Sequence, residues 1–421
     1  MVILIILDLF SGAGGLTEGF FRVGAEFVGH VEADKYACET LKTRTAYWNL
    51  KNQNKLDIYE QYLLKNISRE TLWNEANVLT SDDVINIPIS DETFDNITAK
   101  IKKNLLDKKI KKVDVIIGGP PCQAYSIIGR ARMKENVECD PRNHLYKYYV
   151  RFLKEFKPEM FVFENVPGLK SAGNGRYFQD LKQAIEDAGY DMALDELIAS
   201  NYGVLQTRRR IIIVGWAKNK KYKYPNFEKI ENKNYFVKHV LEDLPEIKPG
   251  TKIEGIRMYK KSPNQYLLNA NIREHNFNIL TQHETRPHNE RDREIYRETI
   301  IAWNKKKERL NYTELSKRRP ELITHKNVTS FTNRFNLIKA DTSASHTILA
   351  HMAMDGHYYI HPDINQLRSL SIREAARLQS FPDNFYFEGP RTSIFRQIGN
   401  AVPPKMAEQI AKKIEEIIHG K

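Results

Sequence analysis

The feature that most constrains the fold is an apolar run that ends in a rigid turn. Residues 113–117 are apolar except for Asp114, which predicts a buried strand, and the residues Gly-Gly-Pro-Pro follow at 118–121. The glycines permit a sharp turn, and the prolines fix φ and remove amide donors. Cys122 comes next, beyond the carboxyl end of the strand, where open α/β sheets bind ligands. This position suits a nucleophile, although a lone cysteine is more often a small buried hydrophobe.

Length and charge narrow the class of protein. A chain of 421 residues can bury a large core and form two lobes. Its 65 Lys and Arg against 53 Asp and Glu leave a net charge of +12, which favours a polyanionic partner. Three cysteines give no disulfide framework and indicate a reducing compartment. The apolar start has no basic leader, and no run reaches the length of a transmembrane helix, so we expect a cytoplasmic protein.

The N-terminal segment predicts a nucleotide cradle. An apolar strand from Val2 to Leu7 is followed by a glycine-rich loop at 8–15 and a helical pattern from 16 to 23. Thr17 stands where a dinucleotide fingerprint would carry its third glycine, so that fingerprint is absent. Glu32 ends the next strand, twenty residues after Gly12, and an acid at that spacing accepts hydrogen bonds from ribose hydroxyls. Together these features favour an adenosine cofactor.

A second reactive side chain follows a second strand. The apolar strand at 160–163 ends at Glu164, and a Pro-Gly turn comes soon after. Adjacent parallel strands would bring Glu164 and Cys122 to the same edge of a sheet, although a glutamate there could equally cap a helix. Gln206, Arg208 and Arg210 alternate into the strand at 211–214, and period-two spacing puts all three on one face.

The remaining segments suggest the domain organisation. Residues 42–110 are rich in Lys, Asn and Asp, and part of them reads as a surface insertion. Residues 127–143 read as a mobile loop, and 145–156 as a helix. From 218 to about 364 no regular alternation appears, which fits a separate, basic lobe. Pattern returns at 373–383 and 397–404, before a helix whose apolar face is formed by Met406, Ile410, Ile414 and Ile417.

These motifs resemble, in order, those of the cytosine-5 DNA methyltransferases. Residues 114–126 follow the family's catalytic loop position for position, and Glu-Asn-Val at 164–166 and Gln-x-Arg-x-Arg at 206–210 match two further motifs. The segments 373–383 and 397–404 are similar to its ninth and tenth motifs. The resemblance covers about two-thirds of the chain, 2–217 and 370–418. It implies that Cys122, Glu164, Arg208 and Arg210 are catalytic.

The resemblance also implies S-adenosylmethionine as cofactor. One expected departure is Ala33, which stands where the family often has an aromatic residue after the ribose acid. In the loop after the cysteine, Arg130 and Arg132 would be candidates for contact with DNA. An equally favoured alternative is that they belong to a solvent-exposed cluster of charges. The cofactor-binding positions implied by the family are Phe10, Gly12, Ala13, Gly14, Gly15, Glu32, Asp83, Val84, Pro121, Leu145, Asn400 and Val402.

The sequence therefore predicts an α/β protein with a doubly wound, mostly parallel, Rossmann-like sheet and a smaller DNA-recognition domain. We expect a catalytic domain at 1–217, a target-recognition domain at 218–393 and a returning segment at 394–421. The predicted function is methylation of a flipped-out cytosine in double-stranded DNA within a bacterial restriction-modification system, by a monomer without metal. Two alternatives remain: a tRNA cytosine methyltransferase, which the large basic insert disfavours, and a catalytically silent binder, which would be expected to lose one of the four catalytic side chains.

Overall fold

The computed structural model describes residues 3–121, 145–324, 328 and 332–420. Its centre is a seven-stranded sheet with strand order β3-β2-β1-β4-β5-β7-β6. Strands β1 to β5 are parallel, and β7 pairs antiparallel with both β5 and β6. This confirms the predicted mostly parallel sheet. The strands are β1 (Ile5–Leu9), β2 (Glu26–Glu32), β3 (Val84–Asn86), β4 (Val115–Gly118), β5 (Met160–Asn165), β6 (Tyr190–Ile198) and β7 (Arg209–Ala217).

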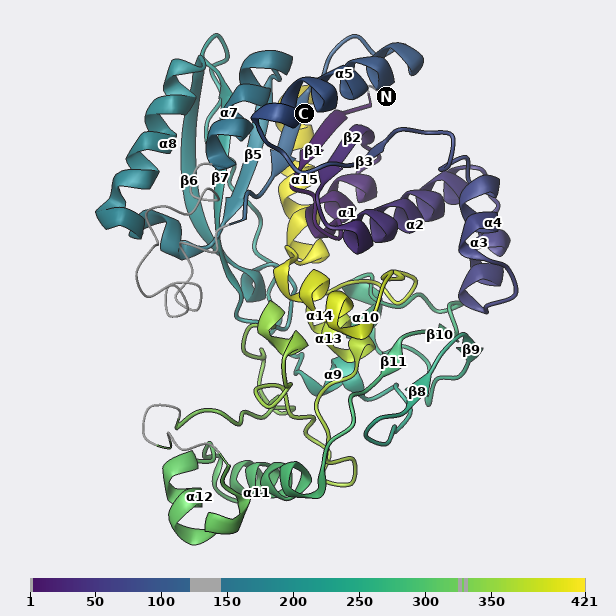
Figure 1. Cartoon of the computed structure of the whole chain (residues 1–421), viewed down its shortest axis with the longest axis vertical. Coiled ribbons are helices and arrows are strands. Elements are labelled where there is room, and N and C mark those ends of the chain that lie inside the picture. The colour runs from purple at the N-terminus through teal and green to yellow at the C-terminus, as the bar shows by residue number, and fades with distance from the viewer. Residues whose placement is uncertain (1–2, 122–144, 325–327, 329–331, 421) are drawn as a thin grey trace.

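Helices cover both faces of the sheet, as the doubly wound prediction requires (Figure 1). One face packs on α5 (Asp91–Asp107), α7 (Leu145–Phe156) and α8 (Arg176–Asp187). The other packs on α1 (Gly15–Arg22) and α15 (Pro404–His419). The predicted apolar face of the last helix is confirmed, because Met406, Ile410 and Ile414 are buried against this face of the sheet.

The first strand begins later than the pattern suggested. We predicted Val2 to Leu7, whereas β1 spans Ile5–Leu9 and Val2 lies outside the described residues. The shift brings Asp8 into the strand, where a charge is not expected. Its buried carboxylate accepts a hydrogen bond from Thr17 Oγ1 at 2.5 Å and lies 3.3 Å from His30 Nδ1, so local polar partners offset the burial.

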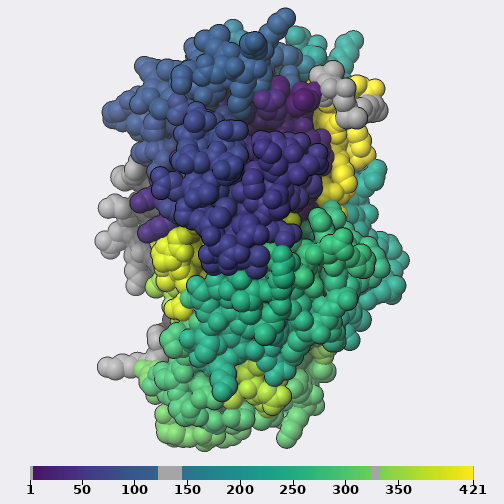
Figure 2. Space-filling model, turned by 90° about the vertical axis from the view of Figure 1, so that its right-hand side faces the viewer, coloured from purple at the N-terminus to yellow at the C-terminus, as the bar shows by residue number. Residues whose placement is uncertain are grey.

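The segment at 42–110 is more integrated than a surface insertion. Helix α2 (Lys35–Asn52) continues well into it, and α3 (Leu56–Leu63) and α4 (Arg69–Glu75) form a buried cluster with α2 and with Ile279 of the second domain. Figure 2 shows this dark-blue part resting on the teal part of the second domain. Buried aromatic side chains, among them Tyr59 and Tyr62, explain why these helices pack rather than project.

The second domain is built from short elements (Figure 1). Two pairs of short strands are antiparallel, β9 (Ile256–Arg257) with β10 (Ile279–Leu280) and β8 (Lys252–Ile253) with β11 (His283–Glu284). The helices are α9 (Lys238–Leu241), α10 (Gln265–Asn269), α11 (Glu290–Lys306), α12 (Tyr312–Arg318), α13 (Ile372–Leu378) and α14 (Arg391–Asn400), with a 3₁₀ turn η6 (Ala350–Ala353). Helix α14 contributes Ile394, Phe395 and Ile398 to the core cluster of this domain.

Candidate active site

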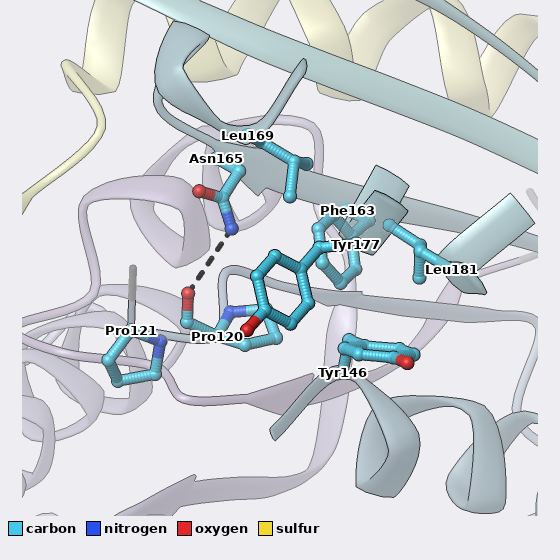
Figure 3. A pocket seen from close by; sticks show the side chains of 8 residues that line it. All are labelled: Pro120, Pro121, Tyr146, Phe163, Asn165, Leu169, Tyr177 and Leu181. Carbon is cyan, nitrogen blue, oxygen red and sulfur yellow. Dashed lines mark hydrogen bonds between the residues drawn. The ribbon is translucent and has the colours of Figure 1, made fainter. Parts of the chain in front are cut away.

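The catalytic loop leaves the sheet between two neighbouring strands. Gly118 has φ +151°, and a Cβ there would lie 2.1 Å from the carbonyl oxygen of Leu9. A Cβ on Gly119 would lie 2.5 Å from Oε2 of Glu164, so neither position admits a side chain. Asn165 Nδ2 donates a hydrogen bond to the carbonyl oxygen of Pro120 at 3.3 Å (Figure 3). The direction of the chain into residue 122 is therefore set by both flanking strands.

Cys122 itself, with Arg130 and Arg132, lies outside the described residues. Pro121, the last described residue before it, is exposed beside a small pocket. Figure 3 shows this pocket closed by Tyr177 and by Tyr146, the neighbour of the predicted cofactor residue Leu145. Leu145 begins α7 and is half-buried. The lining residues are Pro120, Pro121, Tyr146, Phe163, Asn165, Leu169, Tyr177 and Leu181.

Glu164 lies near the end of β5 and is paired with one of the predicted arginines. Arg210 Nε is 2.5 Å from Glu164 Oε1, and the two side chains are 9% and 13% exposed. The antiparallel register of β5 and β7 places Glu164 opposite Ile212, so Arg210 comes from the start of the neighbouring strand. The structure thus brings Glu164 and Arg210 together beside the point where the chain leaves β4 toward Cys122.

Arg208 is directed elsewhere. Only Arg210 of the three alternating residues lies within β7, which begins at Arg209. The Arg208 guanidinium is fully buried and donates to the carbonyl oxygens of Ile348 at 2.9 Å, Gly399 at 3.0 Å and Asn400 at 3.2 Å. Gln206 is also buried and accepts a hydrogen bond from Ile348 N at 3.1 Å. Arg208 therefore holds the second domain and the returning segment against the catalytic domain.

The loop after β1 forms an open cradle. Phe10 and Gly12 have φ of +55° and +56°, and a Cβ on Gly12 would meet no atom within 4 Å. Gly12 N donates to Glu32 Oε2 at 2.8 Å, and the amides of Ala33 and Asp34 donate to Oε1 at 2.9 and 2.8 Å. Burial raises the pKa of Glu32, although these three hydrogen bonds oppose the shift. Ala33 is exposed, so the departure from the family's aromatic residue leaves that side open.

The start of α1 is closed by the returning segment. Gly14 caps the helix with φ +82°, and a Cβ on Gly15 would lie 2.2 Å from the carbonyl oxygen of Val402. Ala13 is buried in the core cluster of the second domain. Asn400 is exposed and Val402 is buried. The contact at Gly15 brings Val402 of the tenth motif to the glycine loop.

Asp83 and Val84 do not reach this edge of the sheet. The parallel register pairs Val84 with His30 and Asn86 with Glu32, so Asp83 lies three residues before the level of Glu32. The Asp83 carboxylate pairs instead with Lys108 Nζ at 3.0 Å. Asn86 Nδ2 donates to the carbonyl oxygens of Glu32 and Ala33 at 3.1 and 3.0 Å. The residue of β3 at the level of Glu32 is Asn86, which the sequence did not single out.

The described residues contain neither a metal-binding group nor a membrane-spanning helix. Within the described part of the chain, no group of three or more His, Cys, Asp or Glu side chains is arranged to hold a metal ion. None of the described helices is long and apolar enough to cross a membrane.

The chain is similar to known DNA methyltransferases along most of its length. A model of the C-5 cytosine-specific DNA methylase family matches residues 4–72 and 85–416. The type II methyltransferase M.Bpa9945I of Bacillus paralicheniformis is 40% identical over 99% of this chain and 100% of that protein. The type II methyltransferase M.FnuDI of Fusobacterium nucleatum is 30% identical over 99% of this chain and 95% of that protein.

Solved structures show the same fold. A prophage-encoded DNA modification methyltransferase from E. coli is 24% identical, with a TM-score of 0.64 over 99% of both chains. The Dnmt2 methyltransferase of S. pombe is 14% identical, with a TM-score of 0.53 over 99% of both chains. The family match spans nearly all of the chain. The chain therefore belongs to the C-5 cytosine-specific DNA methylase family and is a DNA cytosine-5 methyltransferase of the type II restriction-modification kind.

Proposed function

We propose that this methyltransferase transfers a methyl group from S-adenosylmethionine to carbon 5 of a cytosine flipped out of double-stranded DNA, through a covalent bond to Cys122. The observation that carries the proposal is the contact between Gly119, Glu164 and Arg210. The Glu164 carboxyl group, paired with the Arg210 guanidinium, lies against Gly119, which precedes Cys122 by three residues. A cytosine ring attacked by the cysteine would need a polar partner at this point.

The residues at the end of β1 and β2 fit the cofactor. Gly12 leaves open space for the methionine part of the cofactor, and Glu32 Oε2, which accepts one backbone hydrogen bond, keeps acceptor capacity for a ribose hydroxyl. The same loop contains Phe10, Ala13, Gly14 and Gly15, and Val402 contacts it at Gly15. We assign these residues, with Asn400, to the cofactor site. When bound there, S-adenosylmethionine would supply the methyl group. We retain Pro121 and Leu145 as neighbours of this site and replace Asp83 and Val84 by Asn86.

In this proposal Cys122 and Glu164 act on different atoms of the cytosine ring. The thiolate of Cys122 adds to carbon 6 of cytosine and forms an S–C bond, which makes carbon 5 nucleophilic. Electron density moves toward ring nitrogen 3, where the Glu164 carboxyl donates a hydrogen bond or a proton. After methylation, loss of the carbon-5 proton to a base drives out the thiolate, so the S–C bond breaks and the enzyme is regenerated.

The two arginines have different parts in this proposal. Arg210 orients Glu164 and adds positive charge beside the reacting ring. Arg208 acts through the carbonyl oxygens of Gly399 and Asn400, which fix the segment against the glycine loop. We therefore assign Arg208 a positioning role. Because the target carbon is stacked inside a duplex, the base must be flipped out, which costs roughly a few kcal/mol.

The test is bisulfite sequencing of plasmid DNA from methylation-free cells that express this chain, beside a Cys122→Ala control. Protection of cytosines in one short motif, lost in the control, would establish the reaction, the nucleophile and the target together. Protection that persists in Cys122→Ala would remove the covalent step. Absence of protection with soluble wild-type protein would contradict the DNA substrate, and transfer to tRNA would then be assayed.

A further inference from the structure

Helix α11 ends in a group of cations interleaved with aromatic rings, far from the catalytic edge in sequence. We call Trp303, Lys307, Arg309, Lys339 and Tyr358 the basic patch. Lys339 Nζ lies 4.2 Å from the centroid of the Trp303 ring, and Lys307 Nζ lies 5.5 Å from it. The Arg309 guanidinium lies 5.2 Å from the Tyr358 ring centroid. Cations stacked on half-buried rings are held in place without losing their charge.

The basic patch carries more positive charge than its neighbours neutralise. Asp341 accepts from Lys307 Nζ and, at 2.9 Å, from Trp303 Nε1. Among the described residues, neither Arg309 nor Lys339 forms an ion pair with a carboxylate, and Arg309 donates instead to the carbonyl oxygen of Asn333 at 2.7 Å. Lys307 is 59% exposed. An exposed, under-neutralised group of cations fits a polyanion rather than an acidic residue of this chain.

A chain of direct contacts joins the basic patch to the catalytic edge. Tyr359, next to Tyr358, accepts a hydrogen bond on its hydroxyl from Leu349 N at 3.1 Å. The preceding residue, Ile348, accepts from Arg208, whose guanidinium also holds Gly399 and Asn400 beside the glycine loop. The basic patch is thus fixed relative to the site where the cytosine would react, and not carried on an independent arm.

Helix capping explains only part of this arrangement. Cations in the last turn of a helix interact favourably with its dipole, which would account for Lys305, Lys306 and Lys307 at the end of α11. Arg309 and Lys339 lie outside the helix, where Arg309 stacks on Tyr358 and Lys339 stacks on Trp303 of α11. The dipole gives no reason for them to converge there.

We propose that the basic patch binds backbone phosphates of the DNA duplex beside the target cytosine. The inference rests on the proposed function, because it requires that the substrate is duplex DNA. Contacts to phosphates fix the register of a protein on DNA without reading sequence, and each one makes binding more sensitive to salt. The basic patch would therefore contribute affinity and orientation, and leave the choice of target to other side chains.

The experiment measures Kd against salt concentration for a duplex of unrelated sequence, where phosphate contacts supply essentially all binding. The variant carries Lys307→Ala, Arg309→Ala and Lys339→Ala. Each lost contact should reduce the slope of log K against log salt by about 0.9, and three by about 2.7. The sequence methylated in plasmid DNA should not change.

A matched control removes the same charge from the opposite end of the molecule. Lys102, Lys103 and Lys112 are 57%, 62% and 62% exposed, and α5 lies far from α11 in Figure 1. Their triple Ala variant should keep the wild-type slope. An equal loss in both triple variants would overturn the proposal, because it would show a net-charge effect, and so would an unchanged slope in the patch variant.

Two further variants separate charge from folding. Lys307→Arg, Arg309→Lys and Lys339→Arg together keep the charge and should keep the slope. If the triple Ala variant fails to fold, Arg309→Gln and Lys339→Gln are tested singly, each with an expected loss of about 0.9 in slope. Wild-type protein that does not bind duplex DNA would contradict the proposed function itself, whereas salt-dependent binding that the patch variants leave intact would contradict only this inference.

Discussion

Arg210 Nε lies 2.5 Å from Glu164 Oε1, while Gly119 approaches Oε2 of the same carboxyl group. Arg210 thus holds Oε1 of Glu164, and the backbone at Gly119 packs against Oε2. Because Gly119 has no side chain, its backbone can lie this close to the carboxyl group. Changes at Arg210 and at Gly119 should therefore act on catalysis through the position of Glu164.

Replacing Arg210 by Met should lower kcat by roughly 10²–10³-fold, the usual cost of removing one preorganised donor from an active site. Duplex DNA affinity should change far less, because the side chain is only 9% exposed. Single-turnover methyl transfer measures the effect, and Arg210→Lys should recover part of the rate. Equal losses in Lys and Met variants would point to a need for the guanidinium shape, and a normal rate in both would exclude the proposed role.

Gly119→Ala should abolish most activity in a folded protein. Its Cβ would lie 2.5 Å from Glu164 Oε2 and 2.9 Å from the Glu164 carbonyl oxygen, so the carboxyl group must move. Gly29→Ala is a useful comparison, because its nearest contacts of 3.3 and 3.4 Å are flexible side chains away from the site. Circular dichroism establishes folding, and methyl transfer establishes rate. Retained activity in Gly119→Ala would show that the observed approach of Gly119 and Glu164 is not needed.

Much of the catalytic domain could be predicted because its signals are local. Apolar runs that end in Gly, Glu or Pro mark the parallel strands, and their carboxyl ends must meet at one edge. That rule predicted that Glu164 and Cys122 share an edge; it did not predict the pairing of Glu164 with Arg210, which depends on the antiparallel register of β5 and β7. The pattern could not show that Arg208 turns toward Ile348 and Gly399, because those partners lie far away in sequence.

Strand register and tertiary packing explain where the structure differs from the predictions made from the sequence. Which residue of β3 lies level with Glu32 depends on the register between β3 and β2. A strand this short has too little hydrophobic pattern to predict that register from sequence. The helices α3 and α4 looked like an insertion because their surroundings are polar, yet they bury Tyr59, Tyr62 and Trp73. Their partners in the second domain, including Ile279, come from a segment without regular pattern.

Variants of Arg208 and Arg210 should distinguish a structural role from a catalytic one. Arg208→Ala would leave the buried carbonyl oxygens of Ile348 and Gly399 and the half-buried one of Asn400 without this donor, at roughly 1–3 kcal/mol for each buried unsatisfied group. We expect a lower free energy of unfolding and weaker cofactor binding, whereas Arg210→Met should leave the free energy of unfolding nearly unchanged. Denaturant titration and cofactor calorimetry on both variants make the comparison. A stable Arg208→Ala protein that binds cofactor normally but fails in methyl transfer would restore the catalytic assignment.

Two buried histidines should make the second domain sensitive to acid. His283 lies between Ser371 Oγ at 2.8 Å and the carbonyl oxygen of Pro245 at 2.9 Å, and burial lowers its pKa to about 4. Burial likewise lowers the pKa of His361 to about 3. Both values lie below the usual 6.5, so the unfolded chain binds protons first. Their contribution is fully present above about pH 6.5 and is lost as the pH falls toward the folded values.

The free energy of unfolding should therefore fall between pH 6.5 and pH 5, where carboxylates with lowered pKa are still ionised. Each unit of difference between folded and unfolded pKa is worth about 1.4 kcal/mol, so His283 alone could lose roughly 2 kcal/mol over this interval. Guanidinium titrations at several pH values measure the slope. His283→Gln, which keeps a polar side chain but does not titrate, should flatten it. A slope that is the same in His283→Gln and wild type would assign the acid sensitivity to other groups.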